Sequence, residues 1–223
     1  MIELTGTRWI DLSHMHEANM PVDPALKLPE LSFFSRVGNG DQIHNLEVIS
    51  YCPHTGTHMD APFHVCNEWG GMETVDPAAL IGPASVITLH VPEYDYAITR
   101  KDIENWEEQN GAIQEHDAVL LHTGHAGKWE GGNAAYIDKG YVRLDMSAAE
   151  YFVAKKVRFV GMESISVDGA DTECHKKLME NGVYIVENLC HLDEIGASRC
   201  MTVGTFPAVK GASGTWVRLL ALV

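Results

Sequence analysis

Short apolar runs separated by turns dominate the first part of the chain, and helical periodicity appears later. Residues 44–51 alternate apolar and polar side chains, and residues 84–90 are rich in β-branched residues, so both ranges predict strands. Residues 117–122 form a short apolar run, which is typical of a buried strand. The remaining predicted strands cover residues 158–162, 183–186, 200–206 and 215–223.

Three helices are predicted, two of them from capping boxes, in which Ser or Thr precedes an acidic residue by three positions. The capping pairs are Thr99 with Asp102 and Ser147 with Glu150, and the two helices end near Gly111 and Lys156. A third helix is expected at residues 172–181, where Gly182 ends it. Because strands dominate early and alternate with helices late, we expect an α/β fold around a mixed, barrel-like sheet, in one domain of residues 1–223.

Composition excludes several classes of partner. The chain has 31 acidic and 16 basic residues, a formal net charge of −15, which argues against nucleic acid or an anionic membrane as the main partner. Its hydrophobic content of 45% is ordinary for a soluble globular protein, and no apolar stretch approaches the roughly 18 residues of a transmembrane helix. The N-terminus lacks the pattern of a signal peptide and the five cysteines lack a CxxC spacing, so we expect reduced thiols and a cytoplasmic location.

Three histidines and one aspartate within residues 54–64 give the strongest chemical signal. His54, His58, Asp60 and His64 all occupy even positions, so a single extended segment would present them on one face. The prolines and glycine of this segment argue against a helix. Imidazole nitrogen and carboxylate oxygen are ligands that zinc and manganese accept, so the pattern predicts a metal site.

Two residues further along the chain are candidates for the same site. His175 lies near the start of the third predicted helix, and Glu187 lies at the end of the strand that follows it. A helix, a glycine turn and a strand separate them, which can return both side chains to one place. The pair is a weak indication by itself, and it gains weight because His54, His58 and Asp60 leave coordination positions open.

The sequence HTGTHMDAPFH at residues 54–64 resembles the HxGTHxDxPxH signature of the metal-dependent cyclase superfamily, whose members include bacterial kynurenine formamidase and isatin hydrolase. The resemblance continues through residues 175–189 (HKKLMENGVYIVENL), which are similar to the second ligand block of the family. Residues 211–218 (GASGTWVR) are similar to its glycine-rich final hairpin. Together with residues 10–13 (IDLS), the resemblance covers essentially the whole chain.

This resemblance implies a swivelling β/β/α fold and a hydrolase that acts on a C–N bond of a small-molecule substrate. Asp60 matches a ligand able to bridge two metals, and His64 matches the proton-transferring histidine. The positions that match metal ligands are His54, His58, Asp60, His175 and Glu187. Members of the superfamily use two zinc ions or one manganese ion, so we expect Zn²⁺ or Mn²⁺, one or two ions per subunit, in a homodimer or homotetramer.

One departure from the family concerns the substrate. Pro21-Val22-Asp23-Pro24 stands where kynurenine formamidases have Pro-Val-Trp-Pro, so Asp23 places a negative charge where the indole would stack on an aryl ring. Alternative sources of an aromatic wall are Trp9, Phe33, Phe34, Trp69 and Trp129. His122 follows a buried strand and is a further candidate to line the pocket. The residues expected to contact the substrate are Asp23, His122 and Trp129.

The expected reaction is hydrolysis of a formamide or cyclic amide by metal-activated water. A divalent ion lowers the pKa of bound water towards about 7 and polarises the carbonyl, while a histidine, here His64, delivers a proton to the departing nitrogen. Two other functions stay open. One is a non-haem iron oxygenase, because two histidines and one carboxylate can form a facial triad, and the other is a non-catalytic metal-binding protein.

Overall fold

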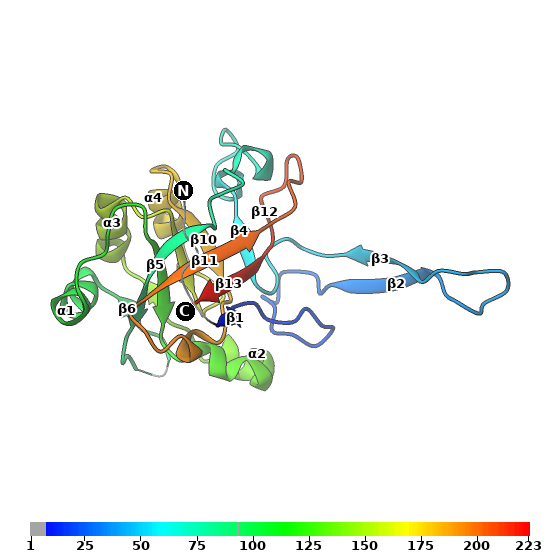
Figure 1. The fold of residues 1–223 in the computed structure, drawn as a ribbon, viewed down its shortest axis with the longest axis horizontal. Coiled ribbons are helices and arrows are strands. Elements are labelled where there is room, and N and C mark those ends of the chain that lie inside the picture. The colour runs from blue at the N-terminus through cyan, green and yellow to red at the C-terminus, as the bar shows by residue number, and fades with distance from the viewer. Residues whose placement is uncertain (1–7, 93) are drawn as a thin grey trace.

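The computed structural model describes residues 8–92 and 94–223, and its central element is a mixed nine-stranded sheet (Figure 1). The expected domain range of 1–223 also covers residues 1–7 and 93, which lie outside the described residues. In spatial order the strands are β1 (Trp9–Asp11), β13 (Arg218–Leu222), β11 (Arg199–Thr205), β5 (Gly82–Thr88), β7 (Ala118–His122), β9 (Phe159–Met162), β10 (Tyr184–Glu187), β4 (His58–Asp60) and β12 (Gly214–Trp216). Strands β5, β7, β9 and β10 run parallel, and the strands that flank them pair antiparallel. The sheet curls into a half-barrel, which confirms the predicted α/β fold with a barrel-like mixed sheet.

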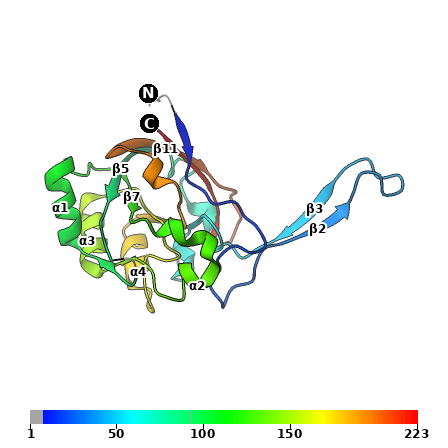
Figure 2. The ribbon, with the colours of Figure 1, turned by 90° about the horizontal axis from the view of Figure 1, so that it is seen from below.

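Three helices cover one face of this sheet. They are α1 (Arg100–Asn110), α3 (Met146–Lys155) and α4 (Glu173–Met179), which lie together on one side of the molecule (Figures 1 and 2). Because side chains alternate in direction along a strand, Leu121 and Val160 pack with these helices, whereas Leu120 and Phe159 belong to a second apolar core. Burial of both faces explains why the parallel strands are continuous apolar runs in the sequence.

Shorter elements complete the chain. They are α2 (Gly132–Tyr136), the paired strands β6 (Ala97–Ile98) and β8 (Arg143–Leu144), and the 3₁₀ turns η1 (Pro62–His64), η2 (Met72–Thr74), η3 (His125–Gly131) and η4 (Leu192–Glu194). Within residues 8–92 and 94–223, no helix has the length and apolar character that crossing a bilayer requires.

A two-stranded hairpin stands apart from the rest of the molecule. It consists of β2 (Glu30–Ser35) and β3 (Leu46–Ser50), which pair antiparallel with Leu31 opposite Ile49. Both views show it projecting away from the sheet and helices (Figures 1 and 2). We call residues Glu30–Ser50 the arm.

Residues 54–64 do not form the one extended segment that was predicted. Only β4 is extended, while Pro62–His64 form the turn η1. Gly56 has a φ of 64°, a left-handed conformation that glycine adopts without steric cost, and the chain bends there before β4. The even spacing therefore places only His58 and Asp60 on one face of β4, and it does not explain why His54 and His64 join them.

Two element boundaries also differ from the prediction. The helix expected to be capped by Ser147 is capped by Asp145, whose side chain accepts a hydrogen bond from the amide of Ala148. The final strand is divided into β12 and β13: β12 pairs with β4, β13 pairs with β11 and β1, and Val217 lies between the two. The capping box of α1, with Thr99 and Asp102, is confirmed.

Candidate metal centre

Strand pairing places the candidate ligands at the end of β10 against those of β4. Glu187 lies directly opposite His58 in the antiparallel register, and Asp60 lies opposite Ile185. Strand β12 covers the other edge of β4, so His58 and Asp60 are fully buried between two neighbours. Helix α4 precedes β10 and carries His175, which is also buried. The helix, turn and strand thus return His175 and Glu187 to the same point, as the sequence analysis expected.

A turn at Gly56 orients His58. A Cβ atom at Gly56 would lie 2.5 Å from the ring of His16, so only glycine fits there. The carbonyl oxygen of Gly56 accepts hydrogen bonds from Nδ1 of His58 and from the side-chain amide of Asn188, both at 2.9 Å. Because Nδ1 of His58 donates to this carbonyl, its Nε2 faces the carboxylates of Asp60 and Glu187.

The inner part of the cluster contains two imidazoles and two carboxylates. Nε2 of His58 lies 3.4 Å from both Oδ1 of Asp60 and Oε2 of Glu187. Nε2 of His175 lies 3.5 Å from Oδ2 of Asp60 and 3.4 Å from Oε1 of Glu187. Each carboxylate therefore faces both imidazoles across a small central space.

The outer part of the cluster shares Asp60 with the inner part. Nδ1 of His54 lies 2.7 Å from Oδ1 of Asp60, and the rings of His54 and His64 lie 3.9 Å apart between centroids. Ligand atoms of His54, Asp60 and His64 fall within 4.8 Å of one another, as do those of His58, Asp60 and Glu187. Asp60 thus lies between two sets of metal-binding groups.

The charges in the cluster stabilise one another despite burial. Burial alone raises the pKa of Asp60, but the nearby charges of His58 and His54 hold that pKa well below its ordinary value. Burial alone lowers the pKa of His175, but Asp168 and the two cluster carboxylates raise it well above its ordinary value. The carboxylates therefore favour a positive charge at the centre of the cluster.

A metal ion fits these residues. Among the described residues, Nε2 of His58 and Oδ2 of Asp60 are buried without a hydrogen-bond partner. Unpaired buried polar atoms are costly, and a cation between the imidazoles and carboxylates would satisfy them. Nitrogen and oxygen donors of this kind suit a borderline divalent ion such as zinc or manganese.

Three residues around the cluster were missed by the sequence analysis. Asp168 accepts a hydrogen bond from Nδ1 of His175 at 2.7 Å, and the hydroxyl of Ser213 lies 2.8 Å from Nε2 of His54. Asn188 directly follows Glu187 and holds the Gly56 turn. The sequence context of each residue is only a weak indication of a role at the site. Asp168 and Ser213 lie next to glycines and Asn188 follows a strand, but these residue types are common in loops.

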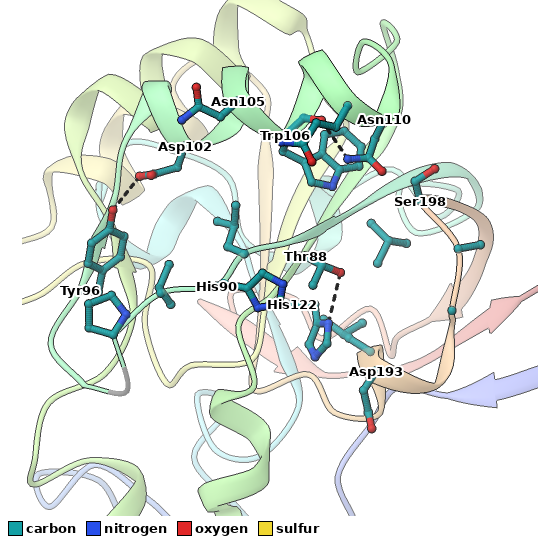
Figure 3. Close-up of a pocket in the computed structure, with 18 residues that line it drawn as sticks. Thr88, His90, Tyr96, Asp102, Asn105, Trp106, Asn110, His122, Asp193 and Ser198 are labelled. Atoms are coloured by element: carbon teal, nitrogen blue, oxygen red, sulfur yellow. Dashed lines mark hydrogen bonds between the residues drawn. The ribbon is translucent and has the colours of Figure 1, made fainter.

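The three predicted substrate contacts do not share one place. Asp23 is exposed in a turn, where its side chain accepts a hydrogen bond from the amide of Ala25. Trp129 is buried and stacks on His14 at 3.7 Å between ring centroids. His122 lines a separate cavity of about 780 Å³, together with His90 and Trp106, and none of the five candidate metal ligands lines that cavity (Figure 3).

The sequence of the chain matches the Cyclase family model over residues 10–169, more than half of its length. The chain therefore belongs to the Cyclase family. It is 28% identical to a kynurenine formamidase of Bacillus mycoides over 95% of this chain and 96% of that protein. It is 29% identical to a kynurenine formamidase of Delftia acidovorans over 86% of each chain.

Solved structures agree with this assignment. Isatin hydrolase A of Labrenzia aggregata has the same fold, with a TM-score of 0.86 at 24% identity over 97% of this chain and 93% of that one. A protein described as a predicted metal-dependent hydrolase of Bacillus stearothermophilus has a TM-score of 0.77 at 27% identity over 96% and 97% of the two chains. The chain is thus a member of the Cyclase family, homologous to kynurenine formamidases and isatin hydrolases.

Proposed function

We propose that this protein is a metal-dependent hydrolase that cleaves the C–N bond of a formamide or a cyclic amide. The observation that carries the proposal is the position of Asp60, whose carboxylate lies between the two sets of metal-binding groups. The proposed ligands are His54, His58, Asp60, His175 and Glu187, which suit one or two Zn²⁺ or Mn²⁺ ions. When bound, such an ion lowers the pKa of a water molecule and polarises the carbonyl that the water attacks.

His64 is the proposed proton-transfer residue. Desolvation of its ring is the largest influence and lowers the pKa of His64 to about 4, and the positive charges of His54 and His175 add to this effect while Asp60 opposes it. His64 is therefore neutral at pH 7 and ready to accept a proton from the attacking water. The imidazolium formed in this way can then protonate the departing nitrogen, which an amide requires before its C–N bond breaks.

The substrate is proposed to be a small molecule. Asp23 and Trp129 are proposed to contact it. An acidic group at position 23 favours a substrate with a hydrogen-bond donor, such as the N–H of a lactam or formamide, over one held by aryl stacking. The subunits are proposed to form a homo-oligomer.

Elemental analysis of the purified protein, followed by a hydrolysis screen, tests the proposed function. We expect stoichiometric zinc or manganese, and turnover of at least one of N-formylkynurenine, isatin and small cyclic imides after reconstitution with that metal. The variant His58→Ala should lose both metal and turnover, whereas His90→Ala, at an exposed position away from the cluster, should keep both. Absence of stoichiometric metal at neutral pH would refute the proposal.

A further inference from the structure

A second cavity lies at the carboxyl ends of two parallel strands, apart from the metal centre. It is the cavity of about 780 Å³ that His122 lines, and β5 and β7 end there with Thr88 opposite His122 in the register (Figure 3). Helix α1 forms one wall, and η4 with the loop that follows it forms another. Ligands of α/β proteins commonly bind beyond the carboxyl ends of the strands, and cavities of this volume hold small molecules.

One face of α1 presents uncharged amides to this cavity. Positions 102, 105, 106, 109 and 110 follow the three- and four-residue spacing of a single helix face, and all five line the cavity. The amide side chains among them are those of Asn105, Gln109 and Asn110, and these three residues are exposed. Because the exposed face of a helix usually carries charged groups, three amides facing a cavity indicate a selective role.

The charged groups near the cavity do not favour an anion. Glu107 of α1 is paired with Lys155 at 2.7 Å, away from the cavity. Asp102 lines the cavity, but its Oδ2 already accepts hydrogen bonds from the backbone amide and the hydroxyl of Thr99. The other acid in the lining is Asp193, which is exposed on η4. Among the described residues that line the cavity there is no lysine or arginine to hold a phosphate or a carboxylate.

Flat rings and aliphatic side chains form the rest of the lining. Nδ1 of His122 lies 3.3 Å from the hydroxyl of Thr88, and Nε2 of His122 has no hydrogen-bond partner among the described residues. The rings of His90, Tyr96 and Trp106 also line the cavity (Figure 3). Its aliphatic lining consists of Val86, Leu89, Val91, Pro92 and Leu192. Such side chains contact the faces of a planar ligand, whereas the amides and His122 can bond to its edge.

We propose that this cavity binds an uncharged, planar nitrogen heterocycle of the purine type. A side-chain amide carries a donor and an acceptor side by side, and Asn or Gln pairs in this way with the ring edge of adenine. Aromatic and histidine rings stack on the faces of such a base. A metal ion is not the ligand, because among the described residues both groups of three close metal-binding side chains contain Asp60. The site is separate from the proposed hydrolysis and does not depend on it.

Calorimetric titration of the metal-loaded protein with adenine tests this site. We expect one adenine per chain, and we expect Asn105→Ala and Gln109→Ala each to weaken binding by about 5-fold to 100-fold, because each removes an amide that pairs with the base. Both positions are exposed on α1 and alanine favours a helix, so the two variants should fold. The control Glu108→Gln changes an exposed residue of α1 outside the cavity and should bind adenine like the wild type. A wild type that does not bind adenine would overturn the inference, as would unchanged binding in both alanine variants.

Two further titrations separate this site from the metal centre and from anion binding. Adenine should bind equally well after a chelator has removed the metal, and loss of binding would place adenine at the metal centre and overturn the inference. Urate, a purine that is an anion at neutral pH, should bind at least about 10-fold more weakly than adenine, because its charge would be desolvated without a cationic partner. Equal binding of the two purines would contradict the proposed selectivity. Failure of the hydrolysis screen alone would leave the inference unaffected, because adenine has no amide bond for the proposed reaction to cleave.

Discussion

The carboxylate of Asp168 holds the imidazole of His175 in one orientation. Oδ2 of Asp168 accepts hydrogen bonds from Nδ1 of His175 at 2.7 Å and from the backbone amide of the same residue at 2.9 Å. Oδ1 accepts from the amide of Cys174 at 2.9 Å, which fixes the carboxylate in turn. With its Nδ1 bound in this way, His175 presents Nε2 to Asp60 and Glu187.

Asp168→Asn should weaken metal binding without unfolding the protein. The amide loses the negative charge that fixes the tautomer of His175, and loss of such a partner costs about 10–100-fold in metal affinity. Competition titration with a chelator measures the affinity. Asp171→Asn, at an exposed position of the same loop, is the control and should bind metal normally. Equal affinity in both variants would show that Asp168 does not orient His175.

His64→Ala should keep its metal and lose most of its turnover. Proton transfer by a positioned side chain is typically worth 10²–10⁴-fold in rate, so kcat should fall by about that factor. Metal content by elemental analysis and kcat on the substrate found by the hydrolysis screen are the two measurements. Because His64 also lies within ligand distance of His54 and Asp60, loss of metal in this variant would instead identify it as a ligand.

Tyr136→Phe should destabilise the fold, because Tyr136 supports the Gly56 turn through Asn188. The buried hydroxyl of Tyr136 donates to the carbonyl oxygen of Glu163 and lies 2.9 Å from Oδ1 of Asn188, whose amide holds the turn. Removing it leaves buried acceptors unpaired, which costs about 1–3 kcal/mol of unfolding free energy. Urea unfolding measures the loss. In the control Tyr184→Phe, the one contact of the hydroxyl among the described residues is a long 3.4 Å hydrogen bond from the amide of Asp76, so little change is expected.

The native state should lose stability as the pH falls from about 6.5 towards 4. Burial is the main reason why the pKa of His125 is lowered to about 4, with Lys128 adding to the effect. Between that value and the unfolded pKa of about 6.5 the unfolded chain binds the proton more readily, so protonation favours unfolding. The contribution of neutral His125 to the unfolding free energy is fully present above pH 6.5. Its loss at lower pH amounts to on the order of 1–3 kcal/mol.

Urea unfolding of His125→Gln at pH 7 and pH 5 checks this dependence. The variant lacks the titrating imidazole, so its unfolding free energy should fall less between the two pH values than that of the wild type. His116→Gln is the control, because His116 is exposed and its removal should leave the pH dependence unchanged. If the unfolding free energy fell equally between pH 7 and pH 5 in the wild type and in His125→Gln, His125 would not be the source of the pH dependence.

Local sequence signals were sufficient for most elements and for the existence of the site. The capping box of Thr99 and Asp102 predicted the start of α1, because both hydrogen bonds form within four residues. The apolar run at residues 117–122 predicted β7, because a strand buried on both faces needs apolar side chains throughout. The family motif likewise identified His54, His58, Asp60 and His64 as one group.

Their three-dimensional arrangement was not predictable from spacing. One extended segment was predicted, but the side chains meet because the chain bends at Gly56 and β4 is held between β10 and β12. Asp168 and His175 are hydrogen-bonded although seven positions separate them in the sequence. Ser213 and His54 lie at hydrogen-bond distance across a separation of 159 positions. Contacts over such separations depend on sheet order, which no local pattern of residues encodes.

The sequence by itself determined the chemistry available to this protein, because imidazole and carboxylate groups at the motif positions restrict the site to proton transfer and metal binding. The tertiary structure decided which of these groups share a centre and which lie elsewhere. It buried His58 and Asp60 between strands and brought Glu187 to His58 through the β10–β4 register, while His122 was placed in a separate cavity. The physical reason is that ligand geometry is set by strand pairing and turn conformation, which depend on packing of the whole sheet.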